Sequence, residues 1–373
     1  MHDYMLPSSG HSVVPIVDAH LDLAYNAMTN GRDLTRSVAE IRVREVRQTD
    51  IATLSFPDLA QAGVAVVFAS IYAMPANPNF AQTLLSEAAS RPHFAVYHTP
   101  EEAEALAHEQ IDRYERWRDD GLVRLITGRS TLAAHLEQWA ADRTLGLVLL
   151  MEGADPIVRV EDLERWWQRG LRIIGLSWAG TRYAGGTGAP GGLTPTGRDL
   201  VAAMRERGVI LDTSHLAEEA FWEALDIGAH AVIASHSNAR ALLALPPDIQ
   251  ADVPSDRHLT DEMISAIGTH DGVIGLNFLN DFLEPRWTMA RREVPVTFAN
   301  QGRRMLEHLA SLIGWHRVGI GSDVDAGYGR DETPQEFDTV ADYVRLRDVV
   351  PPEAQAGVLG GNWLRLLQRS LPD

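Results

Sequence analysis

The chain has 373 residues, with 33 arginines, no lysine, 51 acidic side chains, no cysteine and a net charge of −18. The absence of cysteine excludes disulfides, iron–sulfur clusters, cysteine zinc sites and thiolate nucleophiles, and the absence of lysine excludes a Walker phosphate loop, a Schiff base and a carbamylated lysine between two metals. The acidic balance argues against nucleic-acid and anionic membrane partners, while 45% hydrophobic residues are typical of a globular protein with a substantial core.

The first 25 residues lack a basic start followed by a long apolar stretch. No other window is apolar for the length that a membrane helix needs. We therefore expect no secretory signal, no membrane partner and a cytoplasmic location.

Eight short apolar runs alternate along the chain with amphipathic segments. They are Val14–Leu23, Val64–Tyr72, Leu145–Gly153, Leu171–Trp178, Val209–His215, Ala231–His236, Gly272–Phe278 and Val318–Asp325. Most are too apolar to have one wet face, which is typical of parallel strands covered by helices on both sides. No repeat or linker divides the pattern. It predicts an α/β fold, a single (β/α)8 TIM-type barrel, with residues 1–373 forming one domain.

Two of the intervening helices can be placed from their capping residues. Thr99 and Pro100 begin one that continues to about Asp120, and Thr194 and Pro195 begin another that ends at Gly208. Residues 183–192 are rich in glycine and follow the fourth predicted strand, so we expect a mobile loop there.

Polar residues end several of the predicted strands, at the end where the active sites of such barrels lie. His20 and Asp22 end the first strand and point the same way because side chains alternate along a strand. The third, fifth, sixth and eighth strands end in Glu152, His215, His236 and Asp323. Imidazoles and carboxylates without thiolate suit Zn, Mn, Fe or Co, and a two-metal site holds a bridging hydroxide. Since lysine is absent, Glu152 is the natural bridge.

A histidine at one strand end is more often structural than a metal ligand. We interpret His230, His270 and His316 as structural, because they precede strands and so lie at the opposite end of the barrel. Seven further histidines we expect to be solvated or capping residues: His2, His11, His93, His98, His108, His135 and His308. Glu152 differs, because a carboxylate after an apolar run is costly to bury unless a metal or a cation receives it.

The ordered motifs of the chain resemble those of the renal (membrane) dipeptidase family of the amidohydrolase superfamily, from about Val17 to Leu367. The motifs are Asp18-Ala19-His20-Leu21-Asp22, Met151-Glu152-Gly153-Ala154, Gly192-Leu193-Thr194-Pro195-Thr196-Gly197, Asp212-Thr213-Ser214-His215, Ser235-His236-Ser237-Asn238-Ala239-Arg240, Gly319-Ile320-Gly321-Ser322-Asp323-Val324-Asp325 and Gly360-Gly361-Asn362.

This resemblance implies a metal-dependent hydrolase barrel with two divalent metal ions, expected to be Zn2+, and suggests a homodimer. One metal is held by His20, Asp22 and Glu152, and the other by Glu152, His215 and His236. Asp323 corresponds to the aspartate that passes a proton from the bridging hydroxide to the leaving amine.

Arg257 matches the family's arginine that binds the terminal carboxylate of the substrate, and a guanidinium grips a carboxylate through two parallel hydrogen bonds. The alternative is a surface ion pair of Arg257 with Asp256 or Asp261, because Leu245–Ser255 looks like an insertion relative to the family.

Trp178 stands where the family commonly has a substrate-contacting histidine. An indole donates one hydrogen bond but cannot become a cation, so we expect Trp178 to line the substrate pocket, with Arg182 or Tyr183 as candidate replacements for the histidine. The predicted function is a zinc-dependent dipeptidase that hydrolyses dipeptides through the bridging hydroxide. The alternatives are hydrolysis of another small amide or N-acyl amino acid, or a catalytically inactive barrel with a binding role.

Overall fold

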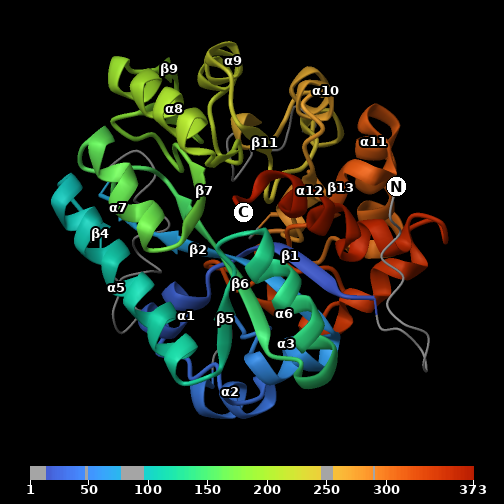
Figure 1. Ribbon diagram of the computed structural model, residues 1–373. Coiled ribbons are helices and arrows are strands. Elements are labelled where there is room, and N and C mark those ends of the chain that lie inside the picture. Colours follow the sequence, from blue (N-terminus) through green and yellow to red (C-terminus); the bar gives the residue numbers. More distant parts are fainter. Residues whose placement is uncertain (1–13, 47–48, 77–95, 245–254, 289) are drawn as a thin grey trace.

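Eight parallel strands surround the centre of the protein in the computed structural model, which describes residues 14–46, 49–76, 96–244, 255–288 and 290–373 (Figure 1). In chain order they are β1 (Ile16–Leu21), β2 (Val64–Tyr72), β6 (Leu145–Glu152), β7 (Leu171–Gly175), β10 (Ile210–Asp212), β11 (Ala231–Ile233), β12 (Ile274–Leu276) and β13 (Val318–Ile320). Their order in the sheet is β11-β10-β7-β6-β2-β1-β13-β12. A parallel bridge between Ala234 and Ile274 joins the two ends of this order, so the sheet is nearly closed into a barrel.

Each of the eight predicted apolar runs contains one of these strands, so the predicted (β/α)8 arrangement is confirmed. Most of the strands end earlier than the runs. His20 and Glu152 still lie within β1 and β6, whereas Asp22, His215, His236 and Asp323 follow the last residue of their strands. One further strand, β5 (Val123–Leu125), pairs with β6 and was not predicted. It has only three residues with an arginine in the middle, so no apolar run marks it.

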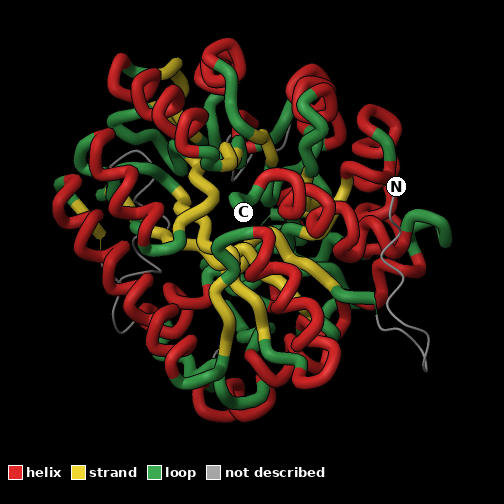
Figure 2. The backbone as a smooth tube through the Cα atoms, viewed as in Figure 1, coloured by secondary structure: helices red, strands yellow, loops and turns green. Residues whose placement is uncertain are grey.

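Helices surround the sheet (Figure 2). They are α1 (Leu23–Thr29), α2 (Val38–Glu45), α3 (Phe56–Ala62), α5 (Pro100–Asp119), α6 (Arg129–Asp142), α7 (Leu163–Gln168), α8 (Pro195–Arg207), α9 (Glu218–Ile227), α10 (Asp261–Thr269), α11 (Arg303–Ile313) and α12 (Asn362–Ser370). The two predicted helices are confirmed with their caps. The hydroxyls of Thr99 and Thr194 accept backbone N–H bonds from the first turns of α5 and α8, and Gly208 ends α8 in the left-handed conformation that glycine adopts without strain. None of the helices in the described ranges is long and apolar enough to cross a bilayer.

The glycine-rich segment after β7 forms a hairpin, so the expectation of a mobile loop over residues 183–192 was wrong about its structure. Strands β8 (Ala184–Gly186) and β9 (Ala189–Leu193) pair antiparallel there. Gly185 and Gly186 pack so closely against neighbouring backbone that a Cβ atom on either would approach it within 3.0 Å. Glycine is therefore required by close packing at these positions, and its presence does not signal a flexible chain.

Residues of β6 alternate between two hydrophobic clusters and thereby fix the direction of Glu152. Leu147, Leu149 and Met151 pack into the larger cluster. Val148 and Leu150 pack into the smaller one, together with residues of α6 and α12. Because side chains alternate along a strand, Glu152 continues the row of Val148 and Leu150 and stands at the end of the smaller cluster.

Candidate metal centre

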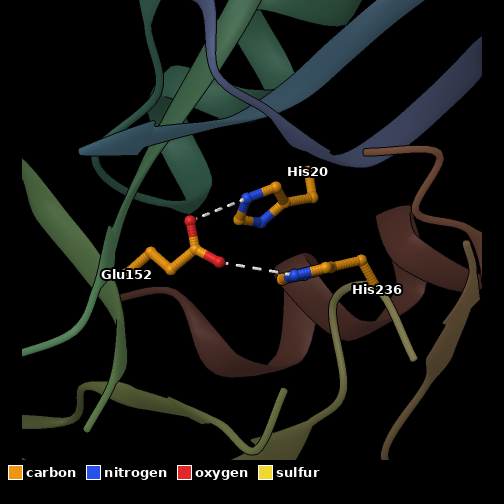
Figure 3. A group of neighbouring side chains, drawn as sticks. All are labelled: His20, Glu152 and His236. Carbon is orange, nitrogen blue, oxygen red and sulfur yellow. Dashed lines mark ion pairs between the residues drawn. The ribbon is translucent and has the colours of Figure 1, made fainter. Parts of the chain in front are cut away.

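Three strand ends bring His20, Glu152 and His236 together at the carboxyl end of the sheet (Figure 3). One ligand atom from each lies within 4.8 Å of the others. The Nε2 atom of His20 is 3.3 Å from Oε2 of Glu152, and the Nε2 atom of His236 is 3.4 Å from Oε1 of the same carboxylate. All three residues are buried.

His215 adds a third imidazole on the side of His236. Its Nε2 atom is 3.1 Å from Oε1 of Glu152 and 3.0 Å from Nε2 of His236. Its φ of 65° lies in the left-handed region, which costs free energy in a residue other than glycine. Glu152 thus presents one oxygen to His20 and the other to His215 and His236.

Asp22 and Asp323 complete the group on the side of His20. The Oδ1 atom of Asp22 is 3.5 Å from Nε2 of His20 and accepts a short hydrogen bond from Ser70 on β2. Asp323 is 3.8 Å from the same nitrogen, and its Oδ2 atom accepts a 2.9 Å hydrogen bond from the side-chain amide of Asn277. The six predicted residues at the strand ends therefore lie in one group.

Burial and mutual charge set the protonation of this group in the metal-free protein. Burial lowers the pKa of all three histidines, but Glu152, Asp22 and Asp323 together reverse this effect for His20 and raise its pKa well above the ordinary value. Burial lowers the pKa of His215 to about 3 and that of His236 well below its ordinary value. Burial raises the pKa of Glu152, but the charge of His20 and the hydrogen bonds from His20, His215 and His236 together lower it well below its ordinary value. The site thus holds one ion pair and two neutral imidazoles.

Asp323 has the opposite perturbation. Burial, together with the carboxylates of Glu152 and Asp22, raises its pKa to about 8 against the attraction of His20 and Arg257. A carboxyl group with a pKa near neutrality can both accept and return a proton at physiological pH. In the metal-free protein, Asp323 therefore has the acid–base character of a proton carrier.

The residues fit divalent metal ions. The Nε2 atom of His20 is buried without a hydrogen-bond partner, although it faces three carboxylates. Unpartnered buried polar atoms are rare and costly, and a bound cation would remove the cost. Imidazoles and carboxylates are the ligands of catalytic zinc and related metals. His20, Asp22, Glu152, His215 and His236 could hold such ions.

Arg257 is buried beside this group, and the expected alternative of a surface ion pair was wrong. The guanidinium donates hydrogen bonds of 2.7 Å to the carbonyl of His236 and 3.1 Å to the hydroxyl of Ser237. Asp256 instead accepts from the backbone of Gly188, and Asp261 pairs with His308. The Nε atom of Arg257 has no partner, so the guanidinium retains a donor for a ligand. Most of the inferred insertion, residues 245–254, lies outside the described residues.

Trp178 packs against the same site. Its ring centroid is 5.8 Å from that of His215 and 5.4 Å from that of Tyr72, and the side chain is partly exposed. Arg182 and Tyr183 do not take the place of a histidine in this structure. The hydroxyl of Tyr183 and the guanidinium of Arg182 both bond the carbonyl of Ile157.

Sequence reasoning missed the residues that support the imidazoles from behind. Ser235 bonds Nδ1 of His236 at 2.7 Å, and Thr187 in the β8–β9 hairpin bonds Nδ1 of His215 at 3.1 Å. Asp212 accepts from Ser235 at 2.5 Å. Asp212 and Ser235 lie near His215 and His236 in the sequence motifs, and this proximity could have identified them. No sequence feature marks Thr187, because it lies in a segment expected to be a loop.

Two of the other histidines are buried: His135, which corrects an expectation, and His258, which follows Arg257 and for which no prediction was made. His135 is buried, with Nε2 2.8 Å from the carbonyl of Ala65, so it is neither solvated nor capping. His230 bonds the carbonyl of Ser370, consistent with a structural role. His2, His11 and His93 lie outside the described residues.

Comparison with known proteins identifies one matching family and several relatives of this chain. The model of the membrane dipeptidase family (peptidase family M19) matches residues 11–370. An uncharacterized Klebsiella pneumoniae protein, encoded in the pqqA 5' region, is 31% identical over 63% of this chain and 86% of its own length. The dipeptidase aclJ of Aspergillus oryzae is 24% identical over 96% of this chain and 80% of its own length.

Two solved structures have a similar fold and 25% sequence identity. Dipeptidase AC, a metallopeptidase of family M19, aligns with a TM-score of 0.73 over 97% of this chain and 100% of its own. A metallopeptidase of Rhodobacter sphaeroides, liganded with a phosphinate mimic of the dipeptide L-Ala-D-Ala, aligns with a TM-score of 0.72 over 96% of this chain and 100% of its own.

Proposed function

The chain belongs to the membrane dipeptidase family, a family of metallopeptidases, and on this premise we propose that it is a zinc-dependent dipeptidase with two metal ions. The observation that carries the proposal is the division of Glu152 between two groups of ligands. Its Oε2 atom faces His20, and its Oε1 atom faces His215 and His236. A carboxylate in this arrangement suits a bridge between two metals.

The proposed ligands follow this division. His20, Asp22 and Glu152 would hold one metal, and Glu152, His215 and His236 the other. When bound, such ions polarise the scissile carbonyl and lower the pKa of a coordinated water.

Two further side chains would act on the substrate. Asp323 would take the proton of the attacking water and give it to the leaving amine, and its amide contact with Asn277 holds it in place for this transfer. Arg257 would bind the terminal carboxylate of the dipeptide, since its Nε–H is left without a partner and its other nitrogens are anchored on the protein.

A dipeptide library with metal quantification tests the proposal. The library contains L-Xaa-L-Xaa and L-Xaa-D-Xaa members, because the R. sphaeroides relative binds a mimic of a dipeptide with a D residue at the second position. The zinc-loaded protein should hydrolyse at least one member, and Glu152→Gln, which keeps the side-chain size, should not. Two bound metals without turnover of any dipeptide would refute the dipeptidase. Less than one metal per chain, without turnover, would favour an inactive barrel.

A second candidate substrate class follows from Trp178. The indole lies against His215 and cannot carry the positive charge of an imidazolium beside a developing oxyanion. We therefore keep N-acyl amino acids and other small amides as the alternative. Activity on N-acyl amino acids above that on dipeptides, shifted back toward dipeptides by Trp178→His, would favour this class.

We also propose that residues 1–373 form one domain. In support, β1 near one end of the chain pairs with β13 near the other, and the indole of Trp363 in α12 donates to the carbonyl of Ile320 in β13. The homodimer and the cytoplasmic location stay predictions.

A further inference from the structure

A buried serine and a buried aspartate lie behind His236, on the side away from Glu152. The Nδ1 atom of His236 is 2.7 Å from Oγ of Ser235, and this hydroxyl is 2.5 Å from Oδ2 of Asp212. The three residues have exposed fractions of 1%, 0% and 2%, so water does not compete for these hydrogen bonds.

The backbone fixes the direction of the bond between Ser235 and Asp212. The Oδ1 atom of Asp212 accepts N–H bonds of 2.8 Å from Ser235 and 3.1 Å from Ser214, which holds the carboxylate with Oδ2 toward the serine hydroxyl. A carboxylate accepts and does not donate, and a serine has a single proton. The proton of Ser235 therefore goes to Asp212, and its oxygen is left to accept from His236.

A chain of hydroxyls reaches Ser235 from the other direction. Arg257 donates to Ser237 at 3.1 Å, Ser237 donates to Ser214 at 3.3 Å, and the oxygens of Ser214 and Ser235 are 3.4 Å apart. Because a guanidinium only donates, this chain runs in the same direction and ends on Asp212. The fixed carboxylate of Asp212 and the hydroxyl chain from Arg257 thus both favour Ser235 as a donor to Asp212.

From this arrangement we propose that Asp212 and Ser235 are positioning residues that fix His236 in the Nδ1–H tautomer. A neutral imidazole has one N–H group, so a proton on Nδ1 leaves the lone pair on Nε2, which faces Oε1 of Glu152. This is the tautomer that a metal ligand needs. The inference rests on the proposed metal centre for its role but not for the hydrogen bonds themselves.

His20 shares the same hydroxyl more weakly. Its Nδ1 atom is 3.4 Å from Oγ of Ser235, and its ring lies 3.8 Å from that of His236. A serine oxygen has two lone pairs, of which His236 takes one, while His20 and Ser214 compete for the other. The effect of Ser235 on His20 is accordingly smaller than its effect on His236.

Two substitutions distinguish the effect of changing the His236 tautomer from the effect of losing one hydrogen bond. In Ser235→Ala, Nδ1 of His236 loses its acceptor, and the carboxylate of Glu152, 3.4 Å from Nε2, then favours the proton on Nε2. In Asp212→Asn, the two backbone N–H groups keep the amide oxygen at the place of Oδ1, so the amide NH2 faces Ser235 and donates to it. The nearest remaining acceptor for the Ser235 proton is Nδ1 of His236 at 2.7 Å, against 3.4 Å for His20 and Ser214. Donation to Nδ1 moves the imidazole proton to Nε2 and blocks metal binding there.

The matched control is Ser322→Ala. Ser322 donates through its backbone N–H at 2.9 Å and its hydroxyl at 2.5 Å to the two oxygens of Asp18, which is the same geometry as that of Ser235 on Asp212. Both serines are 0% exposed. Among the described residues, no imidazole bonds the hydroxyl of Ser322. This control therefore reproduces the cost of removing a buried serine without touching a histidine tautomer.

Two measurements on the full chain test the inference. The first is the 15N spectrum of the metal-free protein, with His236 assigned by its loss in His236→Gln. The second is the affinity for Zn2+ alone, by competition with a chelator. We expect a proton on Nδ1 of His236 in the wild type and on Nε2 in Asp212→Asn. Loss of a residue that hydrogen-bonds a metal ligand typically lowers metal affinity by about 10–100-fold. We therefore expect the Zn2+ affinity to fall about tenfold in Ser235→Ala and about 100-fold in Asp212→Asn. Ser322→Ala should bind like the wild type.

The results for the His236 proton and for Zn2+ binding test this inference separately from the proposed function. A wild-type protein with the proton on Nε2, or variants of Asp212 and Ser235 that bind Zn2+ like the wild type, would overturn it. Equal losses in Ser235→Ala and Ser322→Ala would also overturn it, since both then reflect folding alone. If Asp212→Asn does not fold, the wild-type spectrum and Ser235→Ala still decide. If the wild type binds no metal, the metal centre fails, and the spectrum alone decides the tautomer.

Discussion

Asp323→Asn should abolish catalysis while stabilising the metal-free protein. Asp323 is buried with a folded-state pKa of about 8, and an unfolded aspartate has a pKa of about 3.9. Between these values the folded protein keeps the proton that the unfolded chain releases, so the folded state loses stability as the pH rises from about 4 to about 8. Asparagine cannot ionise, so the variant escapes this loss. Its amide oxygen can still accept from Asn277.

The size of the effect follows from the pKa difference. From the unfolded-state pKa of about 3.9 to pH 7 is about three pH units, and each unit costs about 1.4 kcal/mol of the free energy of unfolding. The ionisation of Asp323 therefore costs the wild type at most about 4 kcal/mol at pH 7. Because 13% of the Asp323 side chain is exposed, solvent reduces this value, and we expect a gain of about 1–3 kcal/mol at pH 7 and none at pH 4. Loss of proton transfer should lower kcat by about 10²–10⁴-fold with the metal content unchanged.

Denaturant unfolding of the metal-free protein at pH 5, 7 and 8 measures the first effect, and turnover of the best dipeptide measures the second. Asp325→Asn is the comparison variant, because Asp325 is also buried with a positive φ and a pKa that burial raises, but it pairs with Arg32 at 3.3 Å. Loss of this ion pair opposes the gain from removing a buried charge, so Asp325→Asn should gain less stability at pH 7 than Asp323→Asn does. An Asp323→Asn protein that is less stable than the wild type at every pH, or that retains a tenth of the activity, would refute this reasoning.

Three further predictions test other parts of the structure. Glu152→Gln should lower the Zn2+ affinity by at least about 100-fold, because both groups of ligands lose their shared charge; equilibrium dialysis that still finds two metals per chain would contradict the proposed bridge. Arg257→Gln should raise KM about 10–100-fold for a dipeptide but not for the same dipeptide with an amidated C-terminus, and equal effects on both would exclude carboxylate binding. Burial lowers the pKa of His135, so as the pH falls through about 6.5 the unfolded state takes up a proton before the folded state does, and the protein loses stability. His135→Gln can keep the bond to the carbonyl of Ala65 but cannot titrate. Chemical denaturation should show that this variant loses less stability between pH 7.5 and pH 5 than the wild type does. An unchanged slope would mean that His135 does not titrate on unfolding.

The order of the strands and the residues at their ends could be predicted from the sequence for a simple reason. A strand covered on both faces is apolar along its whole length, so each of the eight runs is visible by itself. The carboxyl ends of parallel strands meet at one edge, so His20, Glu152 and Asp323 could be placed together before any contact was known. The short strand β5 and the β8–β9 hairpin carry no such pattern and were missed.

The barrel and the set of polar residues at its rim thus follow from the sequence, because strand periodicity and strand polarity are local properties. How these residues are grouped around Glu152 depends on the tertiary structure. It turned the two oxygens of Glu152 toward different imidazoles, buried Arg257 against the carbonyl of His236, and aligned Asp212 behind Ser235. Each of these depends on atoms from separate strands meeting within hydrogen-bond distance, and spacing along the chain contains no information about which atoms face each other across the barrel.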